Sequence, residues 1–344
     1  MFTHSHIRYV LLALLLLTCA SAAQPAGGRG PDDSPGLPTY RSTVSEVRVT
    51  FFATGESNRP IDVLTQSDFA IVDNEQVVRN FRSLAHSTET SLDVVVLVDL
   101  SESVAPRVRA ALSDVLQLVA REQSIAADNI SVLSFGGTSA GSLDGSLGAN
   151  PGRMSRSAAA SILPAVLCAD GCRSSSSAAK LQALKSGGAT PLYDAIIFAA
   201  DFLSQHRRAA DRDTVRPVLI LYSDGFDTIS PHSASDALQA AQDAGVLIYS
   251  VDMGRVENSS GSAFLRQVSE GTGGRYFPRF SSLDGAVAVL NAALEDLRAS
   301  YVVTYDLPSH QAGFHSLRLL PTHNLNLTFH SRNGYEYDYE PGGH

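Results

Sequence analysis

The residues with the clearest chemical potential lie in the run Asp99-Leu100-Ser101-Glu102-Ser103. This run directly follows the apolar stretch 92–98 and precedes a segment with helical periodicity. A carboxylate and two hydroxyls at alternating positions of a turn can direct three oxygen atoms at one cation, and hard divalent cations prefer oxygen ligands. The run therefore predicts a metal site, although the same residue types are also common in solvated turns and as helix caps.

Two later segments strengthen this prediction. Thr190 lies in a glycine-containing loop at 187–194, and Asp224 follows the apolar run 218–222 in the sequence Ser-Asp-Gly. In an open parallel sheet the loops at the carboxyl ends of neighbouring strands meet at one edge. We therefore expect Thr190 and Asp224 to lie near Asp99.

These residues together resemble the metal-ion-dependent adhesion site of the von Willebrand factor type A domain. That site has the pattern Asp-x-Ser-x-Ser, a distant Thr and a distant Asp-Gly, and the resemblance extends over roughly residues 91 to 300. It implies that a divalent cation, Mg²⁺ before Mn²⁺ or Ca²⁺, is held directly or through water. The implied ligands are Asp99, Ser101, Ser103, Thr190 and Asp224. Asp194 and Asp227 are further candidates that would orient these ligands, and they are equally well explained as surface acids.

A cation held in this way keeps an exchangeable position that an oxygen atom of another molecule can occupy. The carboxylate of an Asp or Glu on a partner protein fits that position best. The chain is therefore expected to be a protein-binding module and not an enzyme. The rim around the cation could include Leu192, Tyr193 and Phe226.

Three alternatives stay open. The cation could activate water in a hydrolase, which would need a general base, and His206, His232 and His315 are all isolated in the sequence. The protein could instead be a structural envelope protein whose metal only stabilises the fold. The pattern Gly137-Thr-Ser139-Ala-Gly141 matches a hydrolase nucleophile motif, but the residues after it are poor helix formers, which disfavours that role for Ser139.

The periodicity predicts an α/β fold, with a doubly wound, mostly parallel sheet covered by helices on both faces. Predicted strands at 92–98, 129–135, 218–223, 245–252 and 274–277 alternate with predicted helices at 106–123, 191–205, 233–244, 262–271 and 283–300. The segment 137–186 interrupts this rhythm, with a possible helix at 154–167, and is expected to be a surface insertion. We assign residues 91–300 to this α/β domain.

Both flanking segments alternate apolar and polar residues, which is typical of half-buried strands. Strands are predicted at 44–53, 68–72, 76–81, 301–306, 314–320 and 325–330. We expect segment 41–90 to pair with segment 301–344 as one small β-sandwich, because an isolated hairpin is only marginally stable. This arrangement resembles secreted bacterial proteins related to von Willebrand factor A, on three short motifs at 63–69, 73–77 and 331–335.

The N-terminus predicts export. Residues 1–23 are typical of a signal peptide, with Arg8 before a short apolar core and small residues after it, and residues 24–40 are typical of a flexible linker. No transmembrane anchor is expected after cleavage, so the mature protein would be secreted, periplasmic or otherwise extracytoplasmic. In such a compartment Cys168 and Cys172 are candidates for a local disulfide.

Composition excludes one class of partner. The chain has 344 residues, 44% of them hydrophobic, and a formal net charge of −9. An acidic globular protein without a basic patch is not expected to bind nucleic acid. The sequence leaves the partner and the oligomeric state undetermined.

Overall fold

The structure is a computed structural model that describes residues 46–78, 80–121, 127–136, 164–169, 172, 175–206, 214–256, 259–278 and 285–338. The predicted signal peptide 1–23 and linker 24–40 lie outside these residues, as does the motif around Ser139. Within the described residues, no helix has the length and apolar character needed to cross a membrane.

A six-stranded sheet forms the centre of the α/β domain, in the order β10-β9-β8-β5-β6-β7. The strands are β5 (Ser91–Asp99), β6 (Ala127–Phe135), β7 (Ala165–Cys168), β8 (Val215–Ser223), β9 (Leu247–Asp252) and β10 (Tyr276–Phe277). All neighbouring pairs are parallel except β6 and β7. β5 is an inner strand, as its continuous apolar run predicts, because both faces of an inner strand must be covered.

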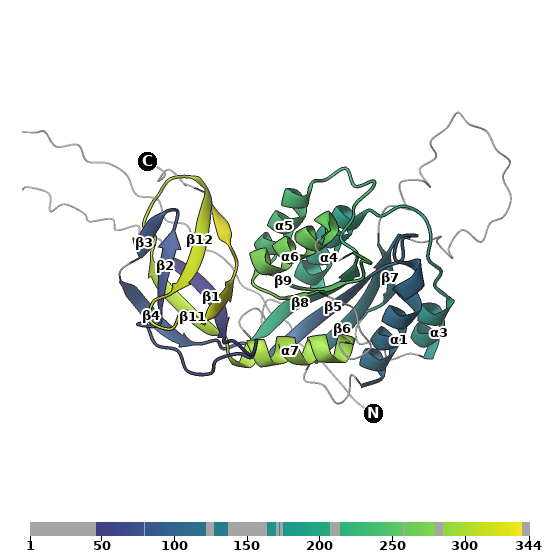
Figure 1. Ribbon diagram of the computed structural model, residues 1–344, viewed down its shortest axis with the longest axis horizontal. Coiled ribbons are helices and arrows are strands. Elements are labelled where there is room, and N and C mark those ends of the chain that lie inside the picture. The colour runs from purple at the N-terminus through teal and green to yellow at the C-terminus, as the bar shows by residue number, and fades with distance from the viewer. Residues whose placement is uncertain are drawn as a thin grey trace, which may run out of the picture. The chain divides into compact units, whose positions relative to one another are not determined.

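Helices cover both faces of this sheet (Figure 1). Side chains of β5 alternate between the two faces, so that Val96 packs against one helical layer and Val95 against the other. The first layer contains α1 (Ala105–Arg121), α3 (Ser175–Ala183) and α7 (Ala286–Arg298). The second layer contains α4 (Leu192–His206), α5 (Ala234–Asp243) and α6 (Ser260–Thr272). The predicted fold class, a doubly wound and mostly parallel sheet between helices, is confirmed.

The described part of segment 137–186 corrects the expectation of a surface insertion. β7 extends the central sheet, and Leu167, Cys172 and Leu181 are all buried in the core on the α1 side. The predicted helix at 154–167 is also wrong at its end, since residues 165–167 belong to β7, while residues 154–163 lie outside the described part of the chain. Pairing with the edge of β6 outweighs the weak local helix preference of a short apolar run.

The flanking segments form two four-stranded sheets that share one core. Their orders are β13-β1-β11-β4 and β14-β12-β2-β3. β1 pairs with β11 and with β13, and β2 pairs with β12. Strands that precede the α/β domain in the sequence therefore pair with strands that follow it. The strands are β1 (Glu46–Thr54), β2 (Phe69–Asp73), β3 (Gln76–Val78), β4 (Phe81–His86), β11 (Tyr301–Asp306), β12 (Gly313–Pro321), β13 (Thr328–Ser331) and β14 (Gly334–Tyr337).

We call this part the sandwich module. Its core is aromatic, with the ring of Phe51 5.0 Å from that of Phe69 and 6.0 Å from that of Phe329. The predicted strand at 76–81 is in fact two strands, β3 and β4, in different sheets. Residues 82–86 of β4 and all of β14 had no counterpart in the sequence prediction, because they alternate less regularly between buried and exposed positions.

Candidate metal centre

Asp99 is the last residue of β5 and its side chain is completely buried. The backbone N–H of Ser101 donates a hydrogen bond of 2.8 Å to Oδ1, and the Ser223 hydroxyl donates one of 2.7 Å to Oδ2. These bonds fix the rotamer of the carboxylate and leave it at the edge of the sheet where β5 ends.

The environment of Asp99 disfavours its charged form. Burial raises its pKa to about 6, and the nearby negative charge of Asp224 adds to this effect, against the hydrogen bonds from Ser101 and Ser223. Among the described residues, neither Asp99 nor Asp224 forms an ion pair with a basic side chain. Two neighbouring carboxylates without a basic partner are the environment in which a cation is most strongly favoured.

Ser101 and Ser103 lie side by side in the turn after β5. Their hydroxyl oxygens are 3.1 Å apart, and Ser101 is buried. Gly136, at the end of β6, supports this turn from behind, because a Cβ atom there would lie 2.9 Å from the backbone nitrogen of Ser101. Gly136 also has a φ of +67°, which L side chains rarely adopt.

The loop that carries Thr190 is attached to the same turn. The N–H of Gly187 donates to the carbonyl of Leu100 at 2.8 Å, and the N–H of Glu102 donates to the carbonyl of Gly188 at 3.4 Å. Thr190 is buried. The glycine loop thus brings the third predicted hydroxyl next to the turn that carries Ser101 and Ser103.

Asp224 follows β8 and is also buried. The next residue, Gly225, has a φ of +79°, and a Cβ atom there would lie 2.1 Å from the carbonyl oxygen of Gly261. Only glycine allows this close approach between the Asp224 loop and the start of α6. The Asp-Gly pair in the sequence therefore has a steric explanation as well as a chemical one.

A second set of hydrogen bonds joins the Asp224 loop to the Thr190 loop. Thr228 and Thr190 are linked by an N–H to carbonyl bond of 2.9 Å and by a bond of 2.8 Å from the Thr190 N–H to the Thr228 hydroxyl. Asp227 accepts bonds from the N–H of Tyr193 at 3.1 Å and from the N–H and hydroxyl of Ser230. Asp227 therefore joins the two loops, and its role in orienting the metal ligands stays a prediction.

Asp194 has a different partner. Its Oδ1 lies 2.8 Å from Nδ1 of His232, so His232 is not isolated as the sequence suggested. The side chain of His232 is 56% exposed, and the pair lies where α4 begins. Within the described part of the chain, the hydrogen bonds of Asp194 go to Ser230 and His232 and to none of the five predicted ligands.

Of the three rim candidates, Leu192 is fully buried in the core and is excluded from the rim. Tyr193 is half-buried and packs edge-on against Phe264, with ring centroids 4.9 Å apart. Phe226 is 43% exposed, and Ile229 on the same loop is 45% exposed. Phe226 is therefore the most exposed of the three rim candidates, and it lies on the loop that carries Asp224.

Sequence analysis missed Ser223 and Gly136. Ser223 orients the Asp99 carboxylate, and its signal was a single hydroxyl residue at the end of an otherwise apolar strand. The signal at Gly136 was a glycine directly after the strand neighbouring β5. The roles of both residues could be predicted only with the strand order known, because each contacts a residue more than thirty positions away in the sequence.

The donor set suits a hard cation. Among the described residues, no group of three or more His, Cys, Asp and Glu side chains could hold a metal ion. The two carboxylates would therefore need the three neutral hydroxyls and water to complete a shell, which is a set that Mg²⁺, Mn²⁺ or Ca²⁺ accepts. The residues present fit such an ion.

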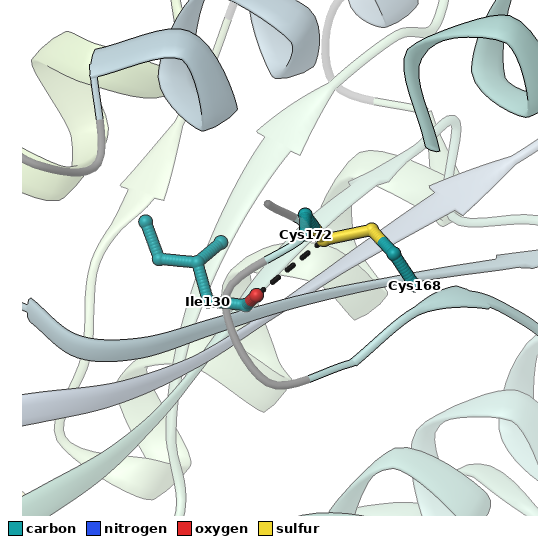
Figure 2. Close-up of a disulfide and its surroundings, with 3 residues drawn as sticks. All are labelled: Ile130, Cys168 and Cys172. Carbon is teal, nitrogen blue, oxygen red and sulfur yellow. Dashed lines mark hydrogen bonds between the residues drawn. A yellow bond between two sulfur atoms is a disulfide. The ribbon is translucent and has the colours of Figure 1, made fainter. Parts of the chain in front are cut away.

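Cys168 and Cys172 form a disulfide at the end of β7, with their Cα atoms 5.0 Å apart (Figure 2). The Sγ atom of Cys172 lies 3.5 Å from the carbonyl oxygen of Ile130 in β6. This is a packing contact, because a sulfur atom in a disulfide has no hydrogen to donate. The bridge therefore lies next to β6 and β7 and is not part of the set of proposed metal ligands.

Comparison with known proteins points to one family. The sequence model of the von Willebrand factor type A domain matches residues 169–290. These residues include Thr190 and Asp224, and they begin after β5, so Asp99, Ser101 and Ser103 lie outside the match. A search of the curated proteins finds no match.

Several solved structures are similar at low identity. The conserved hypothetical protein BatB from Bacteroides thetaiotaomicron is 13% identical, with a TM-score of 0.38, over 60% of this chain and 97% of that one. Proximal thread matrix protein 1 from the mussel byssus, described with a zinc-occupied MIDAS motif, is 14% identical, with a TM-score of 0.38, over 64% of this chain and 48% of that one. The SpRpn10 VWA domain is 12% identical, with a TM-score of 0.36, over 59% of this chain and 94% of that one. This chain thus spans about half of the mussel protein.

Proposed function

We propose that this chain is a metal-dependent protein-binding module, on the premise that the sequence model of the von Willebrand factor type A domain matches residues 169–290. A divalent cation would lie at the edge of the sheet where β5 and β8 end, with Mg²⁺ as the first candidate. The proposed ligands, direct or through water, are Asp99, Ser101, Ser103, Thr190 and Asp224. The cation would bind a carboxylate of an Asp or Glu on a partner protein.

One observation carries this proposal. Asp99 is fully buried beside Asp224, its pKa is raised to about 6, and no basic side chain among the described residues neutralises either group. Burying an uncompensated carboxylate is costly, and proteins normally compensate it with a partner charge or a metal. A divalent cation would compensate both carboxylates at once.

The adjacent hydroxyls support the same conclusion. Ser101 and Thr190 are buried polar residues on loops that backbone hydrogen bonds hold together. Helix capping alone would explain Ser101 and Ser103, but it gives no role to Thr190 on a separate loop. When bound, the cation would supply a positive charge and an exchangeable coordination position, while the chain supplies the fixed oxygen atoms.

The remaining parts of the proposal concern the setting. Residues 1–23 support export of the protein, in agreement with the disulfide between Cys168 and Cys172, since disulfides persist in oxidising compartments. A secreted or periplasmic location, and a bacterial source, stay proposals drawn from the sequence.

Calorimetric titration of the metal-stripped chain with Mg²⁺, Mn²⁺ and Ca²⁺ tests the site. We expect saturable binding at one site, abolished in the double variant Asp99→Ala and Thr190→Ala. Asp114→Asn is the matched control, because Asp114 is also a buried acid but lies on α1 away from the proposed ligands. Equal binding by the native chain and the double variant would show that these residues are ordinary caps and turns.

The hydrolase alternative needs a general base near the cation. The Asp194–His232 pair is the described group that could be tested for this role, because a carboxylate orients the imidazole. The protein-binding proposal expects that His232→Gln leaves metal affinity unchanged. Metal-dependent hydrolysis that disappears in this variant would favour the alternative.

A further inference from the structure

A cluster of buried polar side chains lies inside the sandwich module, outside the candidate metal centre. Asp73 is completely buried at the end of β2, and its Oδ2 atom accepts hydrogen bonds of 2.7 Å from the hydroxyls of Tyr305 and Tyr335. Its Oδ1 atom accepts no hydrogen bond within the described part of the chain. The imidazole of His315 is also buried, and its Nδ1 atom lies 3.4 Å from Oδ1. His315 is isolated in the sequence, but in the fold it lies beside a carboxylate.

This cluster joins segments from both ends of the chain. Asp73 belongs to β2, before the α/β domain, whereas its three partners belong to β11, β12 and β14 after it. β11 lies in one sheet of the module and the other three strands lie in the second sheet, so the cluster also connects the two sheets. Asp73 begins the motif 73–77 and Tyr335 ends the motif 331–335, and neither motif has a role at the metal centre.

Both ring nitrogens of His315 face oxygen atoms that have no hydrogen to donate. Nε2 lies 2.7 Å from the carbonyl oxygen of Gln311, which can only accept. Nδ1 lies 3.4 Å from Oδ1 of Asp73 and 3.4 Å from the hydroxyl oxygen of Tyr335. An ionised carboxylate can only accept, and the Tyr335 hydroxyl already donates its one hydrogen to Oδ2. A neutral imidazole has a single N–H and can satisfy only one of these two sides.

Either neutral form of the ring would leave a buried conflict. With the hydrogen on Nε2, the lone pair of Nδ1 faces Oδ1 of Asp73, which then has no donor. With the hydrogen on Nδ1, the lone pair of Nε2 faces the Gln311 carbonyl at 2.7 Å, which is a hydrogen-bond distance. Buried polar groups without a partner are destabilising and uncommon. A second proton on the ring removes the conflict on both sides.

The tyrosine side chains that face the imidazole stay neutral. Burial raises the pKa of Tyr305 and of Tyr335, and their hydrogen bonds to Asp73 act in the same direction. The rings of Tyr335 and Tyr337 have their centroids 5.2 Å and 5.7 Å from that of His315. These hydroxyls therefore place no negative charge beside the imidazole, and Asp73 is the anion that it contacts.

Two other basic residues lie near the cluster. The guanidinium of Arg332 lies 5.2 Å from the centre of the Tyr335 ring, and the negative charge of Asp73 partly offsets the burial that lowers the pKa of Arg332. The exposed His310 lies against Tyr337, with centroids 6.2 Å apart. Within the described residues, neither Arg332 nor His310 forms an ion pair with Asp73. The direct basic neighbour of Asp73 is therefore the imidazole.

We infer that His315 carries a proton on each ring nitrogen and forms a buried ion pair with Asp73, so that a bound proton holds the sandwich module closed. This inference concerns the sandwich module and is independent of the proposed metal centre. The folded chain would keep a proton that the unfolded chain releases near pH 6.5. The stabilisation is therefore complete below pH 6.5 and is lost as the pH rises, until the folded chain also releases the proton. The module would loosen in alkaline surroundings.

Titration of the histidine rings by NMR tests this inference. The full chain is labelled with ¹⁵N in its histidines and kept in EDTA, and the His315 signals are identified by their contacts with the ring protons of Tyr335 and Tyr337. At pH 8 an exposed histidine such as His323 is neutral by roughly thirtyfold. We expect both ring nitrogens of His315 to remain protonated at this pH. A transition of His315 at the same pH as that of His323, or at a lower pH, would overturn the inference.

Asp73→Asn tests whether the carboxylate retains the proton. The amide has no negative charge, so His315 should be neutral at pH 8 in this variant. Asp306→Asn is the matched control, because Asp306 is an exposed acid at the end of β11, and it should leave His315 doubly protonated. A doubly protonated His315 in Asp73→Asn would also overturn the inference. If Asp73→Asn does not fold, the titration of the native chain still decides the question.

Urea unfolding between pH 6 and pH 9 tests the consequence for stability. The urea midpoint of the native chain should exceed that of Asp73→Asn by an amount that shrinks as the pH rises, because the native chain alone loses the ion pair. Asp306→Asn should follow the native chain over the whole range. A difference between the native chain and Asp73→Asn that stays constant from pH 6 to pH 9 would contradict a proton-dependent closure of the module.

Discussion

Asp99 combines two properties that oppose each other in the metal-free chain. Its carboxylate accepts two well-placed hydrogen bonds, yet burial raises its pKa to about 6. The hydrogen bonds orient the oxygen atoms, while the burial makes their charge costly. If this position served only the stability of the fold, a neutral residue with the same hydrogen bonds would be sufficient.

Asp99→Asn tests this balance. An amide keeps an acceptor for the Ser101 N–H and removes the buried charge, so in EDTA we expect the variant to melt at the same temperature as the native chain or higher. With 5 mM Mg²⁺, only the native chain should gain stability. If the dissociation constant of Mg²⁺ is about a hundredfold below this concentration, binding raises the free energy of unfolding by roughly 2 kcal/mol or more. The measurement is thermal melting followed by circular dichroism.

Asp114→Asn provides the control for this prediction. Burial also raises the pKa of Asp114, and its Oδ2 has no hydrogen-bond partner within the described residues. This variant should keep the full Mg²⁺-dependent shift in melting temperature. A Mg²⁺-dependent shift that persists in Asp99→Asn would contradict the proposed role of Asp99.

His330 is a second residue with a marked preference for one protonation state. Burial lowers its pKa to about 4, the positive charge of Arg275 adds to this, and the ring stacks on Phe52 at a centroid distance of 4.5 Å. The unfolded chain would protonate this histidine near pH 6.5. Between pH 6.5 and 4 the unfolded state therefore binds the extra proton, so stability is complete above pH 6.5 and falls as the pH falls.

We expect the free energy of unfolding to drop by roughly 1–2 kcal/mol from this residue between pH 7 and pH 5, after allowance for its partial exposure. His330→Gln should remove that part of the pH dependence in urea titrations. His323→Gln, at an exposed histidine, is the control and should leave it unchanged. The same slope in His330→Gln and the native chain would refute the assignment.

At the scale of elements, β7 and the disulfide stabilise one edge of the sheet. The bridge closes a loop of four positions, and a loop this short restricts the unfolded chain by only about 2 kcal/mol in the entropy model. Its main effect should therefore be local. In the Cys168→Ala variant we expect faster hydrogen exchange in β7 and α3, with β5 and β8 unchanged.

Hydrogen exchange followed by mass spectrometry checks this expectation. Reduction of the native chain is the matched comparison, since it breaks the same bond and leaves the sequence intact. Faster exchange in β5 or β8 would show that the bridge supports the whole sheet. Unchanged exchange in β7 would show that pairing with β6 alone holds that strand.

Strong periodic elements of the α/β domain were predictable from the sequence. The run 92–98 became the inner strand β5, and Pro191 correctly marked the start of α4. Three of the proposed ligands lie in one short motif, so they could be found without knowledge of the fold. Their grouping with Thr190 and Asp224 depended on the expected parallel order of the strands, and the ligand set itself stays a prediction.

The elements that were not predictable depend on long-range pairing. β7 has four residues, only one of them clearly buried, and its conformation follows from the free edge of β6. β4 and β14 likewise have weak alternation and are defined by their neighbours β11 and β12. A sequence pattern can indicate which face of a strand is apolar. It does not indicate which neighbouring strand will pair with it.

At the scale of the whole molecule, one buried arginine links the α/β domain to the sandwich module. Arg275 forms an ion pair with Asp296 of α7 and donates to the carbonyl of Asn58 at 2.7 Å. Tyr249 donates to the other oxygen of Asp296 at 2.9 Å. Both charged residues are almost fully buried, so removal of one leaves the other uncompensated.

Arg275→Met should therefore lower the free energy of unfolding by about 3–5 kcal/mol. Adding Asp296→Asn should recover part of this loss, because the amide no longer buries a charge. Arg318→Met, which breaks an exposed ion pair with Glu75, should cost less than about 1 kcal/mol. Urea unfolding followed by circular dichroism measures all three, and equal costs for Arg275→Met and Arg318→Met would contradict the argument.

The two connections between the sandwich module and the α/β domain lie next to each other. The N–H of Ser87 donates to the carbonyl of Ser300 at 2.8 Å, and His86 pairs with Tyr301 across β4 and β11. During synthesis, roughly 200 residues are therefore added between the end of β4 and the start of β11. At typical rates of translation this takes on the order of 10 to 40 s. The α/β domain can complete its fold in that interval, whereas the early strands keep unpaired edges that invite aggregation. The order of assembly is thus from the inside outward, and the first strands made are among the last to find their partners.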